Sequence, residues 1–129
     1  LYAADAGTVT FDGAAIGGLP PHRIAQQGIA RTFQNIRLFG SMNTLENVMV
    51  GRHPRTRAGV LGAVLRTRAT RGEEAAITQR ALELLDYCGL SARAGVLARD
   101  LPYGDQRRLE IARALATEPR LLALDEPAA

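Results

Sequence analysis

The alternation of apolar and polar residues predicts short strands in the first part of the chain. In GTVTFDG, residues 7–13, Val9 and Phe11 alternate with polar neighbours and the run closes on Asp-Gly. This pattern is typical of a strand with one exposed face followed by a turn. IARTFQ, residues 29–34, predicts a second short strand. Between them, PPHRIAQQG, residues 20–28, has proline at its start and glycine at its end, which predicts a short helix.

Three further segments carry helical signals. TLENVMVG, residues 44–51, starts with Thr44 as a capping residue, ends on glycine and predicts a two-turn helix. EEAAITQRALELLDYC, residues 73–88, predicts a longer helix that Gly89 closes. GDQRRLEIARALATEP, residues 104–119, predicts another helix, with an acid near its start and proline beyond its end. The apolar positions at helical spacing in the second segment are Ile77, Ala81, Leu84, Leu85 and Cys88.

The last apolar run, RLLALDEP at residues 120–127, predicts a buried strand. The elements therefore follow the order of short strands, a run of helices and a core strand. This order indicates an α/β fold with a helical insertion. One strand and a hairpin do not fill a sheet, so we interpret the chain as part of a larger α/β core.

Composition narrows the class of protein. A chain of 129 residues can form one modest domain with its own core. The single cysteine, Cys88, excludes an internal disulfide. The longest uncharged apolar stretch, residues 58–65, is far shorter than the ~20 residues that a membrane-spanning helix needs. The net charge is +3, and all 16 basic residues are arginine, which excludes any site that depends on lysine.

Two adjacent carboxylates, Asp125 and Glu126, close the last apolar run. Many nucleotide-hydrolysing α/β proteins place an acid beside Mg²⁺ at the carboxyl end of such a strand. In this interpretation Asp125 holds the metal, and Glu126 orients or deprotonates the attacking water. One protein carboxylate is enough for Mg²⁺ where phosphates and waters supply the other oxygens. The alternative is a strand end that simply becomes polar where it meets solvent.

The start of the helix in LPYGDQRRLEIARALA, residues 101–116, is a second candidate for chemistry. Gly104 near the helix start leaves main-chain N–H groups bare at the positive end of the helix dipole, which suits an anion. The alternative is an ordinary helix start that binds nothing. The helix leads after a short turn into the strand that carries Asp125, and this proximity in sequence favours the anion site.

These motifs together resemble a known family. LPYGDQRRLEIARALATEPRLLALDEP resembles the signature helix and Walker B strand of ABC-type ATPases, and ARTFQNIRLFGSMNTLENVMVGRH resembles their Q-loop and the helix after it. The signature tyrosine and the insert GRHPRTRAGVLGAVLRTRATRGEE are similar to those of branched-chain amino-acid importers. The resemblance implies a partial P-loop NTPase core, residues 1–35 and 118–129, with an inserted helical subdomain, residues 36–117.

The resemblance also implies roles for single residues. Gln34 senses Mg²⁺ and the attacking water, Asp125 binds Mg²⁺, and Glu126 is the general base. The signature residues face the γ-phosphate of ATP bound to a second subunit; they are Pro102, Tyr103, Gly104 and Asp105. The common signature is Leu-Ser-Gly-Gly-Gln. Here proline offers phosphate neither a hydroxyl nor an N–H, and the Asp105 carboxylate repels phosphate unless it points aside.

The implied function is ATP hydrolysis that drives an importer for branched-chain amino acids, with ATP and Mg²⁺ as cofactors. The implied partners are transmembrane permease subunits, a second ATPase subunit and, indirectly, a periplasmic substrate-binding protein. The implied location is cytoplasmic, on the inner face of the plasma membrane. Without lysine the chain has no P-loop G-x-x-x-x-G-K-[ST]. We therefore interpret it as an internal fragment without Walker A, D-loop and switch histidine, inactive alone.

Three alternatives stay open. An ABC ATPase for another substrate such as urea carries the same motifs. A DNA-associated ABC ATPase carries them too, and the arginines of residues 52–71 would then contact phosphates. DNA-associated ABC ATPases usually contain long coiled coils, and this sequence shows no sustained heptads. Basic runs are also commonly solvated. We therefore expect no nucleic-acid partner. The third alternative is a non-catalytic regulatory fragment.

Overall fold

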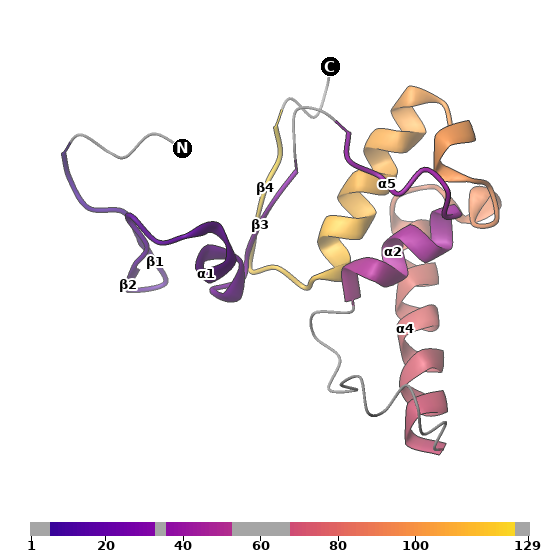
Figure 1. The fold of residues 1–129 in the computed structure, drawn as a ribbon, viewed down its shortest axis with the longest axis horizontal. Coiled ribbons are helices and arrows are strands. Elements are labelled where there is room, and N and C mark those ends of the chain that lie inside the picture. Colours follow the sequence, from indigo (N-terminus) through magenta and orange to yellow (C-terminus); the bar gives the residue numbers. More distant parts are fainter. Residues whose placement is uncertain (1–5, 33–35, 53–67, 126–129) are drawn as a thin grey trace.

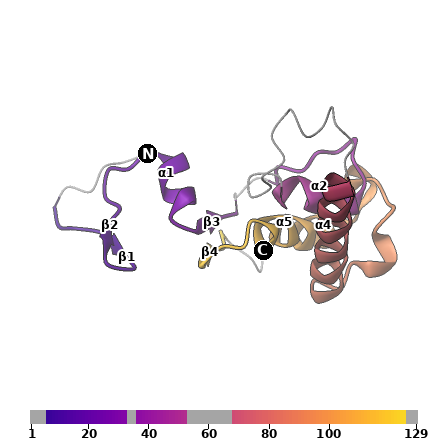
Figure 2. The same cartoon turned by 90° about the horizontal axis from the view of Figure 1, so that it is seen from below.

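The computed structural model of the chain describes residues 6–32, 36–52 and 68–125 (Figure 1). The strands are β1 (Thr10–Phe11), β2 (Ala14–Ala15), β3 (Ile29–Arg31) and β4 (Leu121–Ala123). The helices are α1 (Pro21–Gln26), α2 (Thr44–Arg52), α4 (Arg68–Tyr87) and α5 (Tyr103–Ala116), with the 3-10 turns η2 (Ser91–Arg93) and η3 (Ala98–Asp100). In Figures 1 and 2, β3 and β4 lie between the hairpin with α1 on one side and the helical group on the other.

The strand and turn predicted at residues 7–13 form a hairpin. β1 and β2 pair antiparallel, with Phe11 opposite Ala14. The two turn residues, Asp12 and Gly13, have φ of 51° and 78°. A two-residue hairpin turn of type I′ requires positive φ at both positions, and Asp-Gly supplies residues that tolerate it. The predicted turn is therefore confirmed.

The short helix predicted at residues 20–28 is α1. Pro21 occupies its first position, where the fixed φ of proline suits a helix and the missing N–H costs nothing. Gly28 follows with φ of 91° and begins the contact with the last strand. Its carbonyl accepts hydrogen bonds from the N–H groups of Arg120, at 2.7 Å, and Leu121, at 3.1 Å.

β3 and β4 form a parallel pair from opposite ends of the chain. Ile29 stands opposite Leu121, and Arg31 opposite Ala123. The prediction that the last strand is buried is wrong for the described residues, because Leu121 is 46% exposed and Leu124 42% exposed. Among the described residues β4 pairs with β3 alone, and a sheet of two strands is too small to bury the apolar side chains of its strands.

The start of α2 differs from the prediction. Asn43, not Thr44, caps the helix, because the Asn43 Oδ1 accepts from the Glu46 N–H and the Glu46 Oε2 accepts from the Asn43 N–H, both at 2.8 Å. This reciprocal pair is a capping box. Thr44 is the first helical residue, and its hydroxyl donates to the carbonyl of Val96 at 2.9 Å. Thr44 therefore ties α2 to the loop before η3.

The end of α2 also differs from the prediction. Gly51 was expected to end the helix, but α2 continues to Arg52. Gly51 is buried, and a Cβ built on it lies 2.4 Å from the carbonyl oxygen of Arg113 on α5. The glycine is therefore required by the close approach of two helix backbones rather than by a helix end.

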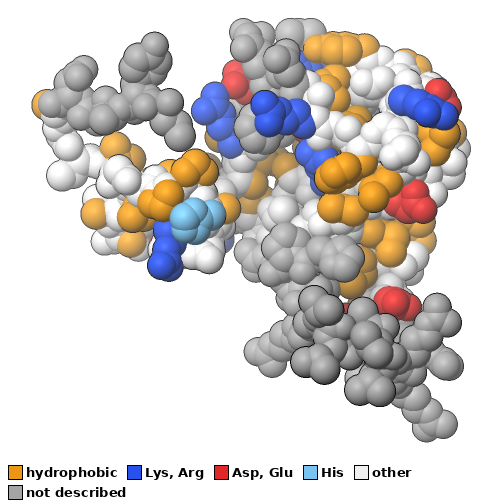
Figure 3. Space-filling view, in the orientation of Figure 1, with side chains coloured by type: hydrophobic (Ala, Val, Ile, Leu, Met, Phe, Trp, Pro, Cys, Tyr) orange, Lys and Arg blue, Asp and Glu red, His pale blue; other side chains and the backbone are white. Residues whose placement is uncertain are grey.

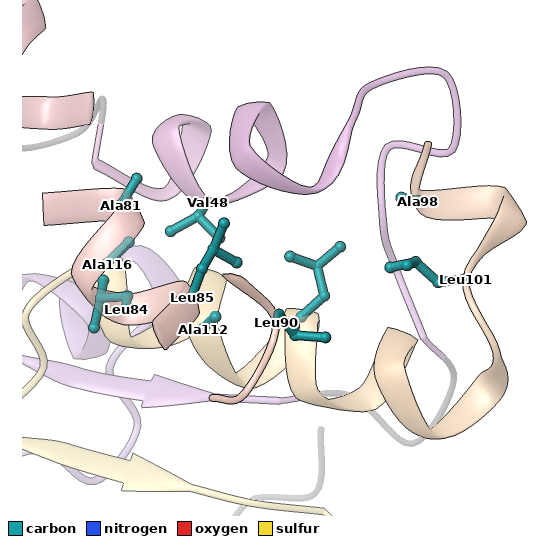
Figure 4. Packing of buried hydrophobic residues seen from close by; sticks show 10 residues of the cluster. Val48, Ala81, Leu84, Leu85, Leu90, Ala98, Leu101, Ala112 and Ala116 are labelled. Carbon is teal, nitrogen blue, oxygen red and sulfur yellow. The ribbon is translucent and has the colours of Figure 1, made fainter. Parts of the chain in front are cut away.

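α2, α4 and α5 pack together around one hydrophobic core (Figure 4). Complete burial of a leucine or valine side chain contributes about 1.5–3 kcal/mol. Among the described residues the strands contribute nothing to this core. Its members are Val48, Ala81, Leu84, Leu85, Leu90, Ala98, Leu101, Leu109, Ala112 and Ala116.

The core face predicted for residues 73–88 is largely correct. Ala81, Leu84 and Leu85 are buried, whereas Ile77 and Cys88 are half-buried. The helix α4 then closes in a Schellman motif, as Gly89 predicted. The N–H of Leu90 donates to the carbonyl of Leu85 at 2.7 Å, and Gly89 has φ of 71°. This motif directs Leu90 into the core and leads into η2.

The surface mixes apolar and charged side chains. Figure 3 shows hydrophobic side chains over both groups of elements, with charged side chains among them. In the described ranges, no helix combines the length and the apolar content needed to cross a membrane. The exposed large hydrophobic residues are Val9, Phe39, Leu82, Tyr87, Tyr103, Leu121 and Leu124.

Candidate functional site

The first part of the site is the carboxyl end of the β3–β4 pair. The N–H of Thr32 donates to the carbonyl of Ala123 at 3.0 Å, and the N–H of Asp125 donates to the Thr32 hydroxyl at 3.1 Å. Thr32 is only 4% exposed. Because parallel strands end at the same edge of a sheet, this buried threonine holds Asp125 at that edge.

The Asp125 side chain forms an ion pair with Arg31. The Arg31 Nη2 lies 2.8 Å from the Asp125 Oδ2, and the two side chains are 65% and 29% exposed. Ion pairs of this exposure contribute only about 0–1 kcal/mol, so the carboxylate can exchange the guanidinium for another cation. No cluster of three metal-binding side chains occurs among the described residues. Asp125 thus fits Mg²⁺ only where other oxygens, such as phosphates, complete the coordination.

Two predicted residues of this edge, Gln34 and Glu126, lie outside the described residues. Their roles stay predictions, as does any role for the arginine-rich segment, of which residues 53–67 are also outside. Arg52 is described, and its guanidinium forms an ion pair with Glu118. This contact joins the end of α2 to the turn after α5.

The second part of the site is the first turn of α5. Pro102 precedes the helix and provides no side-chain cap. Its carbonyl accepts from the N–H groups of Asp105 and Gln106, both at 2.9 Å, whereas the N–H groups of Tyr103 and Gly104 have no acceptor within the described part of the chain. A Cβ built on Gly104 meets nothing within 4 Å. The first turn is therefore open and offers N–H donors to an anion.

The side chains around this turn are held by their neighbours. The guanidinium of Arg107 lies over the ring of Tyr103, 5.6 Å from its centre. The Gln106 Nε2 donates to the carbonyl of Leu101 at 2.8 Å. Both contacts run along the helix and leave the first N–H groups uncovered.

The Asp105 carboxylate is paired with two arginines. Its Oδ2 lies 2.9 Å from the Arg93 Nε, and its Oδ1 lies 3.6 Å from the Arg108 Nη1. The Asp105 side chain is 16% exposed. The expected repulsion between this carboxylate and an anion at the helix start is thus reduced by neighbouring positive charge. Sequence reasoning missed Arg93, because no local pattern connects η2 with the start of α5.

The two parts of the site are separate within one chain. The first turn of α5 is the end of the helix away from the turn that leads into β4. Figures 1 and 2 show the start of α5 in the helical group, apart from β3 and β4. Gly104 and Asp125 therefore lie on separate groups of elements in the described part of the chain.

The described groups with a shifted pKa lie outside both parts. Burial raises the pKa of the Cys88 thiol, and the nearby charge of Arg108 opposes this rise. Burial lowers the pKa of Arg113, and the charge of Glu110 opposes that change. A hydrogen bond from Arg80 lowers the pKa of Glu83 on the surface of α4.

Comparison with known proteins gives the family. Residues 1–129 match the family model described as ABC transporter. The chain is 43% identical to the high-affinity branched-chain amino acid transport ATP-binding protein LivG of Salmonella typhimurium and 44% identical to BraF of Pseudomonas aeruginosa. Each alignment covers 100% of the chain and 51% of the relative. The chain thus spans about half the length of these curated relatives.

Solved structures give the same result for the fold. A nucleotide-free ATP-binding cassette from an ABC transporter superposes with a TM-score of 0.71 at 30% identity, over 99% of this chain and 50% of that chain. A dimeric post-hydrolysis cassette bound to ADP and Pi superposes with a TM-score of 0.73 at 28% identity, over 98% and 51%. The predicted α/β class and the predicted cassette fold are confirmed.

Proposed function

The chain belongs to the ABC transporter family, and on this premise we propose that it is part of the ATP-hydrolysing subunit of an importer for branched-chain amino acids. The observation that carries the catalytic assignment is the parallel pairing of β3 with β4, which holds Asp125 beside the buried Thr32. The substrate class rests on the 43–44% identity to two branched-chain amino acid transport proteins.

In this proposal Asp125 holds Mg²⁺, and Gln34 contributes to the same metal site. Glu126, next to Asp125, orients or deprotonates the attacking water. Mg²⁺, when bound, neutralises phosphate charge during phosphoryl transfer. Arg31 neutralises the Asp125 carboxylate in the absence of metal, and the exposure of this ion pair allows it to open.

The residues that face the γ-phosphate in this proposal are Pro102, Tyr103, Gly104 and Asp105. Their contribution is the open first turn of α5, whose N–H groups are free donors within the described residues. Because this turn is separate from Asp125, the nucleotide lies between the Asp125 edge of one copy and the α5 start of a second ATPase subunit. A solved dimeric cassette of similar fold supports this arrangement.

The proposal extends to partners, location and domains. Transmembrane permease subunits receive the conformational change, and Gln34 couples the nucleotide to them. A periplasmic substrate-binding protein participates indirectly, and the subunit is cytoplasmic and peripheral to the inner face of the plasma membrane. Residues 1–35 and 118–129 belong to the ATP-binding core, and residues 36–117 form the helical subdomain that carries the signature.

The test uses the full-length protein that contains this chain, with its permease and binding protein in vesicles. We expect Mg²⁺-dependent ATP hydrolysis that leucine, isoleucine or valine stimulates and urea does not. Glu126→Gln should keep ATP binding and lower turnover about 10²–10⁴-fold, because it removes one base. Glu74→Gln, which changes an exposed acid of α4, is the matched control and should keep wild-type turnover. Absence of hydrolysis by the wild type overturns the enzyme assignment, whereas stimulation by urea alone overturns only the substrate.

A further inference from the structure

Arg93 contacts the first turn of α5, and its role rests on the proposed function of that turn. Asp105 is the third residue of α5. It lies in the first turn, which binds the γ-phosphate in the proposed function. A carboxylate at the third position of a helix commonly accepts a hydrogen bond from the N–H of the cap residue. Pro102 is the cap residue here and has no N–H to give. The Asp105 carboxylate therefore needs a different partner.

Arg93 supplies that partner from η2. Its Nε lies 2.9 Å from the Asp105 Oδ2, which is the distance of a charge-assisted hydrogen bond. Arg108 is a weaker partner, since its Nη1 lies 3.6 Å from the other carboxylate oxygen and its side chain is more exposed than that of Arg93. Arg93 is thus the main contact that determines where the carboxylate lies.

The main chain around Arg93 is well anchored. The Arg93 N–H donates to the carbonyl of Leu90 at 2.9 Å, and the Arg93 carbonyl accepts from the N–H of Val96 at 2.9 Å. Leu90 is buried in the core, and the carbonyl of Ala94 accepts from the N–H of Leu45 on α2 at 3.0 Å. The position of Arg93 is therefore determined by α2 and α4, independently of the first turn of α5.

We propose that Arg93 is a positioning residue: it prepares the first turn of α5 to recognise the γ-phosphate of ATP that is bound to a second subunit. It holds the Asp105 carboxylate against η2, and the N–H groups of Tyr103 and Gly104 stay open to the γ-phosphate. Without Arg93, the carboxylate keeps only the longer contact with Arg108, at 3.6 Å, and turns toward these same donors, which carry the positive partial charge of the helix start. There it occupies the donors and repels the phosphate.

The test compares Arg93→Gln, Asp105→Asn and the double variant in the full-length protein. Two quantities are measured: the KM for ATP, and the ATP concentration that gives half-maximal dimerisation in a Glu126→Gln background. Arg93→Gln should raise both about tenfold, as expected for one uncompensated charge near a phosphate. The double variant should match Asp105→Asn in both quantities, because no carboxylate is left for Arg93 to position. Arg93→Lys should raise both quantities less than Arg93→Gln does, because lysine keeps the positive charge.

The controls separate this proposal from a structural role and from the proposed function. Arg80→Gln removes an arginine whose ion pair with Glu83 lies on α4, and it should change neither quantity. The proposal is overturned if Arg93→Gln raises the two quantities equally in the Asp105→Asn background and also lowers the melting temperature. Arg93 would then have a structural role. Wild-type values in Arg93→Gln overturn it as well. A wild-type protein that neither hydrolyses ATP nor dimerises with it refutes the proposed function and this inference together.

Discussion

Thr32 and Asp125 are joined by a hydrogen bond in which the N–H of Asp125 donates to the threonine hydroxyl at 3.1 Å. Thr32→Val keeps the shape of the buried side chain and removes this acceptor. We expect the free energy of unfolding to fall by about 0.5–1.5 kcal/mol, the usual contribution of one hydrogen bond. Urea unfolding of the chain measures this free energy, and Thr32→Ser is the control that keeps the hydroxyl. Equal stability of Thr32→Val and wild type would show that this bond does not hold the strand ends.

Gly51→Ala tests the contact between α2 and α5. The new methyl group would lie 2.4 Å from the main-chain carbonyl oxygen of Arg113, so the helices must move apart. Overpacking of this kind costs about 1–3 kcal/mol. Gly72→Ala on α4 is the matched control, since its Cβ meets nothing within 4 Å. We expect the control to raise the melting temperature of the chain, because alanine favours a helix over glycine by roughly 1 kcal/mol, and Gly51→Ala to lower it.

Asn47→Ala tests a buried polar anchor. The Asn47 Oδ1 accepts from the N–H of Phe39 at 3.0 Å, and its Nδ2 donates to the carbonyls of Phe39 and Asn43 at 3.1 and 3.0 Å. Removal of this fully buried side chain takes away the acceptor of the Phe39 N–H, and loss of such a partner costs about 1–3 kcal/mol. The carbonyls of Phe39 and Asn43 keep main-chain donors. We therefore expect the free energy of unfolding in urea to fall by about 1–3 kcal/mol. Ser41→Ala, at an exposed position of the same loop, should leave stability unchanged.

Cys88 gives a pH dependence that can be measured directly. Burial raises the pKa of its thiol, and the charge of Arg108 opposes this only in part. The native state therefore binds the thiol proton more tightly than the unfolded state, and the associated stability is full below the unfolded pKa and is lost as the pH rises through the folded pKa. We expect the rate of iodoacetamide alkylation to rise at higher pH in the folded chain than in the chain in urea. A lower midpoint in the folded chain would contradict this.

The absence of lysine predicts that the 129-residue chain does not hydrolyse ATP by itself. In a P-loop, the lysine contacts the β- and γ-phosphates of ATP. This chain has no lysine and so lacks that contact. Phosphate release with ATP and Mg²⁺ should stay at the level of a buffer blank. The full-length protein, assayed in parallel, provides the positive control. Mg²⁺-dependent turnover by the short chain would show that it forms a complete site.

Local signals in the sequence predict the elements of this fold well. Asp-Gly predicts the hairpin turn, Pro21 predicts the start of α1, and Gly89 predicts the end of α4, because each has a conformational preference that needs no tertiary partner. The capping box of α2 was also readable, since Asn43 and Glu46 have the required spacing. Thr44 has the residue type of a helix cap as well, but its hydroxyl forms a tertiary hydrogen bond with Val96.

Contacts between distant segments could not be predicted in this way. Gly51 has the appearance of a helix end, and only its approach to α5 shows why glycine is needed there. The pairing of Arg93 with Asp105 depends on the packing of η2, which no periodicity encodes. At the candidate site, the motifs indicated Asp125 and the α5 start, but the buried Thr32 gave no signal beyond a polar residue after a strand.

The parallel pairing of β3 with β4 has a consequence for biosynthesis. The two strands are roughly ninety residues apart, and the whole helical group lies between them. On the ribosome β3 emerges long before β4 is made, so its hydrogen-bonding edge stays open while the helices condense. Formation of the helical core first shortens the path between the strands and lowers the entropy lost when they meet. The edge that holds Asp125 therefore forms only after the helical group has been synthesised, and until then β3 presents the edge that pairs with β4 to other strands.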